Sequence, residues 1–205
     1  MGPIAKEIEA HYLQGGESER LSNEWGELER LRTQGILARH LPSSPAVIVD
    51  VGGGDGTLLI EILRTHPLLR GRVLDLPPAA AAAADKLAAS DVADRASAVA
   101  GNFFDSLPGG ANAYVLSDVI RDWDNSNAVK VMDACARAAG HGSSVIVIEE
   151  LRGADTAHAL TLAVVTGGRE RSADQLTALA RACGLSLRST AQVSGRRTAL
   201  EFIVT

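Results

Sequence analysis

The strongest constraint in this 205-residue sequence is a cluster of glycines, four of them within five positions, in the segment "VDVGGGDGTLL" at 49–59. A glycine costs roughly 0.5–1 kcal/mol of backbone entropy compared with alanine, so such a cluster needs a physical reason. The residues before it, "AVIVDV" (46–51), are typical of a buried strand, and residues 56–66 have apolar side chains at helical spacing. A glycine-rich turn between a strand and a helix lets a ligand approach the backbone closely.

The rest of the chain continues this alternation of short apolar runs and helical stretches. We expect further strands at 71–76, 95–102, 113–119 and 143–150, further helices at 77–90, 126–140, 154–168 and 172–185, and a terminal hairpin of 186–193 and 197–204. The strands are apolar throughout, which predicts an α/β fold with a mostly parallel sheet and helices on both faces. Residues 1–45 are expected to be a short N-terminal helical extension, with a helix over 17–41 acting as a lid on a domain at 46–205.

Composition argues against several classes of function. The net charge is −5 and no Lys/Arg cluster occurs, so we expect no nucleic-acid partner and no membrane partner. No apolar stretch approaches the ~18 residues of a membrane span, and the N-terminus has no apolar signal core. The two cysteines, Cys135 and Cys183, lie in helical stretches, which predicts unpaired thiols in a reducing cytoplasm. The five histidines are scattered without metal-ligand spacing, so no metal site is predicted.

The spacing of the glycines distinguishes between known types of glycine-rich turn. A Walker loop needs a Gly-Lys-Ser/Thr ending, and no lysine follows here. The dinucleotide fingerprint GxGxxG fails, because its third glycine would fall at Thr57. What remains is an acidic residue, Asp50, followed by Gly52-x-Gly54-x-Gly56. The alternative without a ligand is a plain tight turn from strand to helix.

A second acidic residue, Asp75, ends the next expected strand, 19 residues after Gly56. In open α/β sheets a carboxylate at this place accepts hydrogen bonds from the two hydroxyls of a ribose. Taken singly, Asp75 is equally well explained as a cap of the following helix. Together with the glycine turn, it favours a site for a nucleoside-containing ligand.

Over about residues 46–204 the sequence resembles the catalytic domain of the plant-caffeate-type and bacterial natural-product O-methyltransferases, which are class I enzymes that depend on S-adenosylmethionine (SAM). Six segments carry the resemblance, in the family's order and rough spacing: "VDVGGGDGTLL", "VLDLPP", "GNFFDSLP", "VLSDVIRDWDN", "VIVIEE" and "GGRERSADQLTALARACGL". The resemblance implies a Rossmann-like sheet of seven strands, mostly parallel, with one antiparallel strand near the C-terminus. It also implies methyl transfer from SAM to an oxygen of a small natural-product-like acceptor, with S-adenosylhomocysteine (SAH) as the product.

The resemblance also implies roles for individual residues. Asp50, Gly52, Gly54 and Gly56 would surround the methionine portion of SAM, Asp75 and Leu76 would hold the ribose, Asn102 and Phe103 would flank the adenine, and Ser117 would lie near the methionine end. An Asn amide can bond the adenine amino group, and a Phe ring supplies a stacking face.

The sequence departs from the family where the chemistry is expected. The acid of the family's "GDxF" motif is here Asn102, and the general-base histidine of its His-Asp-Trp motif is here Arg121, which cannot accept a proton at physiological pH. The remaining candidate bases are Glu149 and Glu170, which match the two acids that accompany the family's histidine. Each has a plainer explanation: Glu149 as a strand-end carboxylate bonded to backbone or arginine, Glu170 as a solvated acid at a helix start. Arg121 would pair with either acid or bind a carboxylate or enolate of the acceptor, unless it is a surface arginine.

The family's large N-terminal dimerisation domain has no counterpart here beyond residues 1–45, so we expect a monomer or a weak homodimer. Other functions remain open at this point. The first is a SAM-binding enzyme of the same fold that does not transfer methyl, such as a cyclase, hydroxylase or decarboxylase. The second is a non-catalytic, or an engineered and truncated, domain.

Overall fold

The computed structural model describes residues 46–151, 167–194 and 197–205. The expected helix at 17–41, the extension at 1–45 and most of the expected helix at 154–168 lie outside the described residues.

The described chain forms one sheet of seven strands in the order β3-β2-β1-β4-β5-β7-β6. The strands are β1 (Ala46–Val51), β2 (Leu69–Asp75), β3 (Ala96–Ala100), β4 (Ala113–Ser117), β5 (Ser144–Glu150), β6 (Leu185–Ser194) and β7 (Arg197–Val204). The pairs among β1 to β5 are parallel, and β7 runs antiparallel to both β5 and β6. The expected seven-stranded sheet and its antiparallel C-terminal hairpin are therefore confirmed.

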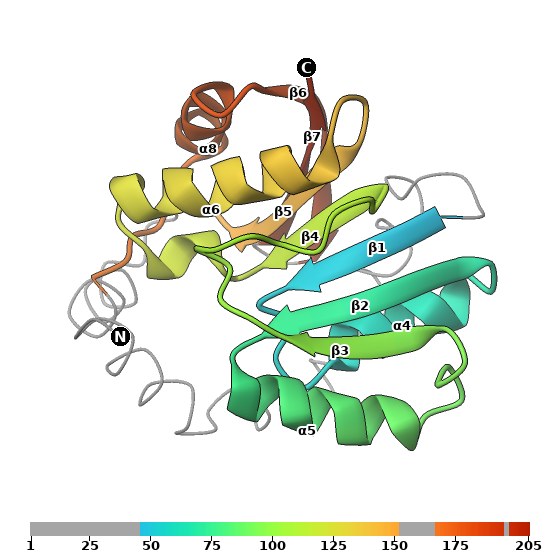
Figure 1. Ribbon diagram of the computed structural model, residues 1–205. Helices are drawn as coiled ribbons and strands as arrows, with labels where there is room; N and C mark the ends of the chain where they lie inside the picture. The colour runs from blue at the N-terminus through green and yellow to red at the C-terminus, as the bar shows by residue number, and fades with distance from the viewer. Residues whose placement is uncertain (1–45, 152–166, 195–196) are drawn as a thin grey trace.

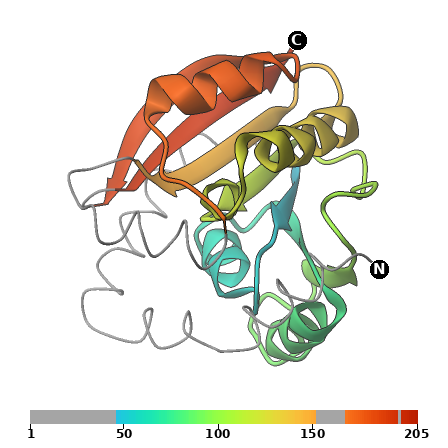
Figure 2. The same cartoon turned by 90° about the vertical axis from the view of Figure 1, so that its left-hand side faces the viewer.

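Helices cover both faces of the sheet, as expected (Figure 1). They are α4 (Thr57–Thr65), α5 (Pro77–Ala88), the short 3₁₀ helix η1 (Ile120–Asp122), α6 (Asn125–Ala139) and α8 (Ala173–Arg181). Successive strand residues point to opposite faces. Tyr114 and Leu116 of β4 therefore pack in one core with α6 and α8, while Val115 packs in the other with α4 and α5. Figure 2 shows α8 (orange) beside the β6–β7 hairpin (red) at one edge of the sheet.

Local sequence explains where several of these helices begin. Asp124 caps α6 by accepting a hydrogen bond from the Asn127 N–H at 2.8 Å. Ser172 and Gln175 form a reciprocal capping box at the start of α8. The helix α5 has proline in its first turn, where the missing N–H breaks no helical bond.

Several expected elements end earlier in the structure than the sequence indicates, and two of these ends have a clear cause in the backbone. The strand expected to reach residue 119 ends at Ser117, because Asp118 has φ 57° and turns the chain out of the sheet. The helix expected to reach residue 185 ends at Arg181, because Gly184 takes φ 71° and Leu185 already begins β6.

The strand order places the site. From β1 the chain moves outward through β2 and β3, then returns to β4 on the other side of β1. In open α/β sheets, ligands bind beyond the carboxyl ends of the strands where the order reverses in this way. The ends of β1, β2 and β4 carry Asp50, Asp75 and Ser117.

Candidate functional site

The glycine turn follows β1 and needs glycine for two different reasons. Gly52, Gly54 and Gly56 have φ of 69°, 56° and 80°, a region that residues with a side chain rarely adopt. A β-carbon on Gly52 would lie 2.8 Å from Cγ2 of Val119, so the backbone here is packed against its neighbour. A β-carbon on Gly54 would meet nothing within 4 Å, so the turn is open toward a ligand at this point.

Asp50 lies beneath the turn as a buried carboxyl without a partner. It is 1% exposed, and neither carboxylate oxygen has a hydrogen-bond partner among the described residues. A β-carbon on Gly53 would lie 2.6 Å from Asp50 Oδ2, so the carboxyl directly underlies the turn. Burial, and then the charges of Asp75 and Asp55, raise the pKa of Asp50 to about 7.

Asp75 connects the end of β2 to the same turn. Its Oδ2 accepts a hydrogen bond from the Gly54 N–H at 2.8 Å, and its Oδ1 accepts one from the Leu76 N–H at 2.7 Å. Burial raises its pKa, and these two hydrogen bonds offset that only in part. The structure thus brings together Gly54 and Asp75, which lie 21 positions apart in the sequence. From the sequence, both residues are expected to contact the same ligand.

A third acid, Asp55, completes the turn, with a lysine beside it. Asp55 Oδ1 accepts from the N–H and hydroxyl of Thr57, and Asp55 Oδ2 lies 2.6 Å from Lys86 Nζ. Partial burial raises the pKa of Asp55, but the hydrogen bonds from Lys86 and Thr57 outweigh it and lower the pKa. Three carboxyls, those of Asp50, Asp55 and Asp75, therefore surround the turn. Lys86 is the one basic side chain among the described residues that pairs with any of them, and it pairs with Asp55. This turn favours a cationic ligand over the phosphates of a dinucleotide.

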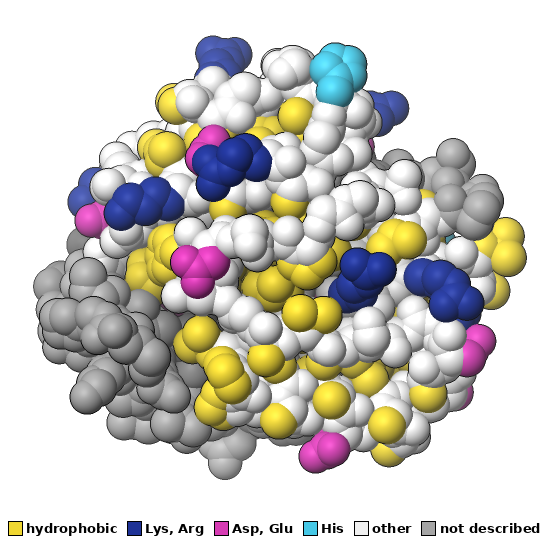
Figure 3. Space-filling view, in the orientation of Figure 1, with side chains coloured by type: hydrophobic (Ala, Val, Ile, Leu, Met, Phe, Trp, Pro, Cys, Tyr) yellow, Lys and Arg dark blue, Asp and Glu magenta, His cyan; other side chains and the backbone are white. Residues whose placement is uncertain are grey.

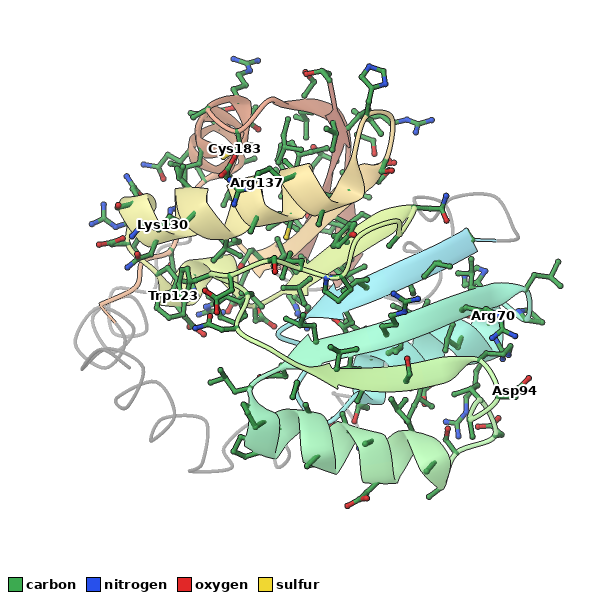
Figure 4. All side chains as sticks on the ribbon, in the orientation of Figure 1. Arg70, Asp94, Trp123, Lys130, Arg137 and Cys183 are labelled. Carbon is green, nitrogen blue, oxygen red and sulfur yellow. The ribbon has the colours of Figure 1, made fainter. Side chains whose placement is uncertain are left out.

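Asn102 and Phe103, expected to flank a nucleobase, lie on the loop after β3. Asn102 Oδ1 accepts from the Phe104 N–H at 3.0 Å, which fixes the side chain and leaves its NH₂ group as donor. Phe103 is buried, with its ring 5.8 Å from that of Trp123 in an edge-to-face contact. Trp123, labelled in Figure 4, lies by the first turn of α6. Phe103 therefore serves the core as well as any ligand.

Glu149, near the end of β5, is bound to the backbone of η1. It is 3% exposed, and its Oε1 accepts from the N–H groups of Ile120 at 2.9 Å and Arg121 at 3.1 Å. Its Oε2 is buried and has no partner among the described residues. Burial, followed by the charge of Asp118, raises the pKa of Glu149 well above its usual value, and Arg121 offsets only part of that. Glu149 is therefore bonded to the backbone, as in the simpler of the two interpretations that the sequence allowed.

Arg121 is buried at the same place and is not a surface arginine. It is 7% exposed, and its Nη1 lies 3.5 Å from Asp118 Oδ1 and 3.7 Å from Glu150 Oε2. These ion pairs join Arg121 to Asp118 and Glu150, neither of which is one of the two acids, Glu149 and Glu170, that the sequence indicated as its partners.

The segment before α8 holds η1 from the other side. Arg171 donates from Nη1 to the Ile120 carbonyl at 2.9 Å and from Nη2 to the Trp123 carbonyl at 2.7 Å. The Arg169 N–H donates to the Arg121 carbonyl at 2.8 Å. Glu170, the second candidate base, lies between these two anchored residues and is therefore held beside η1.

Sequence reasoning missed Asp118 and Arg197. Arg197, at the start of β7, donates from Nη2 to Ser117 Oγ at 2.8 Å and to the carboxylate of Asp118. No local pattern marks Arg197, because its place beside the end of β4 follows from the antiparallel pairing of β7 with β5. Asp118 stands in the quoted segment "VLSDVIRDWDN", but nothing in that string shows its left-handed backbone.

Other kinds of site find little support in the described residues. No group of three or more His, Cys, Asp or Glu side chains there has metal-binding geometry. The same residues contain no helix whose length and hydropathy suit a membrane crossing. On the face drawn in Figure 3, the described Lys and Arg side chains lie singly or in pairs among apolar and uncharged surface.

The chain matches a protein-family model described as an O-methyltransferase domain, over residues 5–186. The match begins within residues 1–45, well before the segments on which the sequence resemblance was based. Among solved structures, an O-methyltransferase from neocarzinostatin biosynthesis, in complex with SAM and 2-hydroxy-5-methyl naphthoic acid, superposes with a TM-score of 0.79. It is 36% identical, and the alignment covers 98% of this chain and 67% of that one.

Two curated relatives differ in the reaction that their names give. The 2,7-dihydroxy-5-methyl-1-naphthoate 7-O-methyltransferase of Streptomyces carzinostaticus is 43% identical over 163 residues, which are 78% of this chain and 49% of the relative. The aclacinomycin 10-hydroxylase of Streptomyces purpurascens is 35% identical over 159 residues, 74% of this chain and 42% of the relative. This chain spans less than half the length of either relative.

Proposed function

This chain belongs to the O-methyltransferase family, and from that membership we propose that it binds SAM and transfers its methyl group to an oxygen of a small aromatic acceptor. The observation that carries the proposal is the acidic glycine turn, with Asp50 buried and unpartnered beneath it. The sequence similarity to a naphthoate O-methyltransferase supports an aromatic acceptor, and the similarity to a solved structure in complex with SAM supports SAM as the methyl donor.

The residues of the turn fit the cofactor. SAM carries a sulfonium and an amino group, so a turn with three carboxyls, of which Asp50 has no partner among the described residues, suits it, whereas it would repel a pyrophosphate. The open space at Gly54 admits a ligand to the backbone. We propose that Asp50, Gly52, Gly54 and Gly56 surround the methionine portion and that Ser117 lies at its end. Asp75 and Leu76 would hold the ribose, and Asn102 and Phe103 the adenine.

When bound, SAM supplies a methyl group on a positively charged sulfur, and SAH remains after the transfer. What the chain contributes is alignment of the acceptor oxygen and, for a neutral hydroxyl, a place for its proton. We propose that Arg121 orients an acidic acceptor through its guanidinium, which cannot itself accept the proton. A naphthoate-like acceptor, with a carboxylate near its hydroxyl, has the required charge.

The two candidate acids would then have different roles. Glu149 uses one carboxylate oxygen to bind the backbone of η1, so we propose that it positions Arg121. Glu170 is held beside η1 by its neighbours and is the better candidate to receive the acceptor's proton. A fold-preserving Glu170→Gln variant tests this assignment, because loss of a general base lowers kcat by roughly 10²–10⁴-fold.

A second function is favoured by one observation, the arginine in the slot of the family's histidine. The similarity to an aclacinomycin 10-hydroxylase shows that a relative of this chain carries a name other than methyltransferase. In that case SAM binding persists but the acceptor leaves without a methyl group. Product mass separates the two functions.

The proposed function predicts binding and transfer together. Isothermal titration should give micromolar affinity for SAM and for SAH, which corresponds to about −8 kcal/mol. Incubation with SAM and a panel of phenols, enols and hydroxynaphthoates should yield a product heavier by one CH₂ group, with an equal amount of SAH. Absence of binding to either ligand at millimolar concentration would contradict the proposal. Binding with an oxygenated or decarboxylated product would favour the second function.

Asp75 provides a direct test of the cofactor site. Asp75→Ala should weaken SAH binding by about 1–3 kcal/mol, because it removes charge-assisted hydrogen bonds to the ribose. Asp85→Ala, on the exposed side of α5, is the matched control and should leave the affinity unchanged. If a folded Asp75→Ala variant binds SAH as the parent does, Asp75 serves only the turn and the helix start.

We also propose that the protein functions in the cytoplasm as a monomer or weak homodimer. Both cysteines are free in the structure, as a reducing compartment allows. Sedimentation at several protein concentrations measures the oligomeric state directly.

A further inference from the structure

Arg197 lies outside every motif that identified the site, yet its guanidinium reaches the end of β4. Its Nη2 donates to Ser117 Oγ at 2.8 Å and also bonds the carboxylate of Asp118, residues 80 and 79 positions away in the sequence. The side chain is only 16% exposed. An arginine held this far from water, and joined to the last residue of β4 and to the residue after it, fixes the geometry of that strand end.

The residue that Arg197 holds is conformationally unusual. Asp118 is the one non-glycine residue with positive φ in the described part of the chain, at 57°. Its N–H still donates to the Ile148 carbonyl at 2.9 Å, so the turn begins directly after the last ladder bond of β4. Its carboxylate is shared between Arg197 and Arg121. A strained backbone of this kind persists only where surrounding contacts determine it.

The turn at Asp118 brings the next residue against the glycine turn. A β-carbon on Gly52 would lie 2.8 Å from Cγ2 of Val119, so the Val119 side chain packs on the Gly52 backbone as closely as glycine allows. Gly52 also donates from its N–H to the Leu74 carbonyl at 2.8 Å, which places it between β2 and Val119. Any shift of the Asp118 turn therefore moves Val119 against the start of the glycine turn.

We propose that Arg197 is a positioning residue for the cofactor turn. Its bond to Asp118 holds the left-handed turn after β4, that turn seats Val119 on Gly52, and Gly52 begins the loop that receives the ligand. The C-terminal hairpin thus sets the shape of a site built at the ends of β1, β2 and β4. The ligand part of this inference rests on the proposed function, whereas the effect on the ligand-free loop does not.

The plainer explanation is that Arg197 only stabilises the hairpin, and a rescue experiment separates the two. If Arg197 acts through the backbone of Asp118, Asp118→Gly makes the arginine unnecessary, because glycine adopts positive φ without support. If Arg197 only ties β7 to the sheet through the Asp118 carboxylate, Asp118→Gly removes the same ion pair and is itself as harmful as Arg197→Met.

The test compares Arg197→Met, Asp118→Gly and the double variant with the parent. Arg188→Met is the matched control, since Arg188 is exposed on the neighbouring strand and pairs there with Glu201. Hydrogen exchange is followed in peptides containing residues 50–56 and 117–120 of the ligand-free proteins, and SAH affinity is measured by titration.

We expect Arg197→Met to speed exchange in both peptides at least tenfold and to weaken SAH binding at least tenfold, with Arg188→Met within twofold of the parent. Asp118→Gly alone should stay within twofold of the parent, and adding Arg197→Met to it should change either quantity less than twofold. The inference is overturned if Arg197→Met resembles the control, if Asp118→Gly alone is as harmful as Arg197→Met, or if the effect of Arg197→Met is undiminished in the double variant. If the parent binds no SAH, the proposed function fails, and the exchange comparison still decides the role of Arg197.

Discussion

Asp50→Asn is expected to make the ligand-free protein more stable above about pH 7, by up to about 4 kcal/mol, while weakening its affinity for SAH at least tenfold. The reason is a carboxyl that is 1% exposed and has no hydrogen-bond partner among the described residues. Asparagine keeps the shape and removes the charge. A site residue that costs stability in the absence of its ligand is what a pre-formed cation site requires.

The sign of this effect follows from the pKa of Asp50, which is raised from 3.8 to about 7. The folded protein therefore holds the proton more tightly than the unfolded chain does. Stability associated with the protonated carboxyl is fully present below about pH 4 and is lost as the pH rises to about 7. The difference between the two values corresponds to about 4 kcal/mol, so the variant's gain over the parent should grow through this window and be complete above about pH 7.

Urea unfolding between about pH 4 and pH 8 measures the prediction directly. Asp55→Asn is the matched control, because Asp55 lies in the same turn but pairs with Lys86 and has a lowered pKa. That variant should lose stability at neutral pH instead of gaining it. If the free energy of unfolding of Asp50→Asn, plotted against pH, runs parallel to that of the parent across the whole range, Asp50 does not titrate as the structure indicates.

Glu149→Ala should lower the free energy of unfolding by about 2–4 kcal/mol, because it leaves the N–H groups of Ile120 and Arg121 without an acceptor. Glu149→Gln keeps an oxygen in place for both donors and removes a buried charge, so its loss should be well below that of Glu149→Ala. The pair of variants separates the support of η1 from the charge of the carboxylate.

Methyl transfer by the same pair distinguishes a positioning residue from a base. We expect Glu149→Gln to retain more than a tenth of the parent kcat with an unaltered KM for SAM, and Glu149→Ala to lose both activity and acceptor affinity. A folded Glu149→Gln variant that binds SAH normally but loses more than 100-fold in kcat would make Glu149 the base. The fall of kcat at low pH, which reports protonation of the base, should then disappear only in that variant.

The sequence by itself determined the order of elements and the turn and strand ends at which we propose that the cofactor binds. Strand and helix periodicities are local, and so is the reason for glycine at 52, 54 and 56, where the chain must turn from strand to helix. The acids Asp50 and Asp75 were found because strand ends of a parallel sheet meet at one edge, so their position along the chain fixes their position in space.

Only the tertiary structure decided how the charged side chains around η1 and the end of β4 are paired. The contact between Arg197 and Asp118 depends on β7 inserting antiparallel beside β5, a pairing that no residue near either one encodes. Whether Glu149 faces a ligand or a backbone depends on where η1 settles, and that is set by Arg171 from a third segment. The backbone conformation of a turn decides locally which residue types can occupy it. The partner of a buried charged side chain depends instead on which distant segments the fold packs beside it.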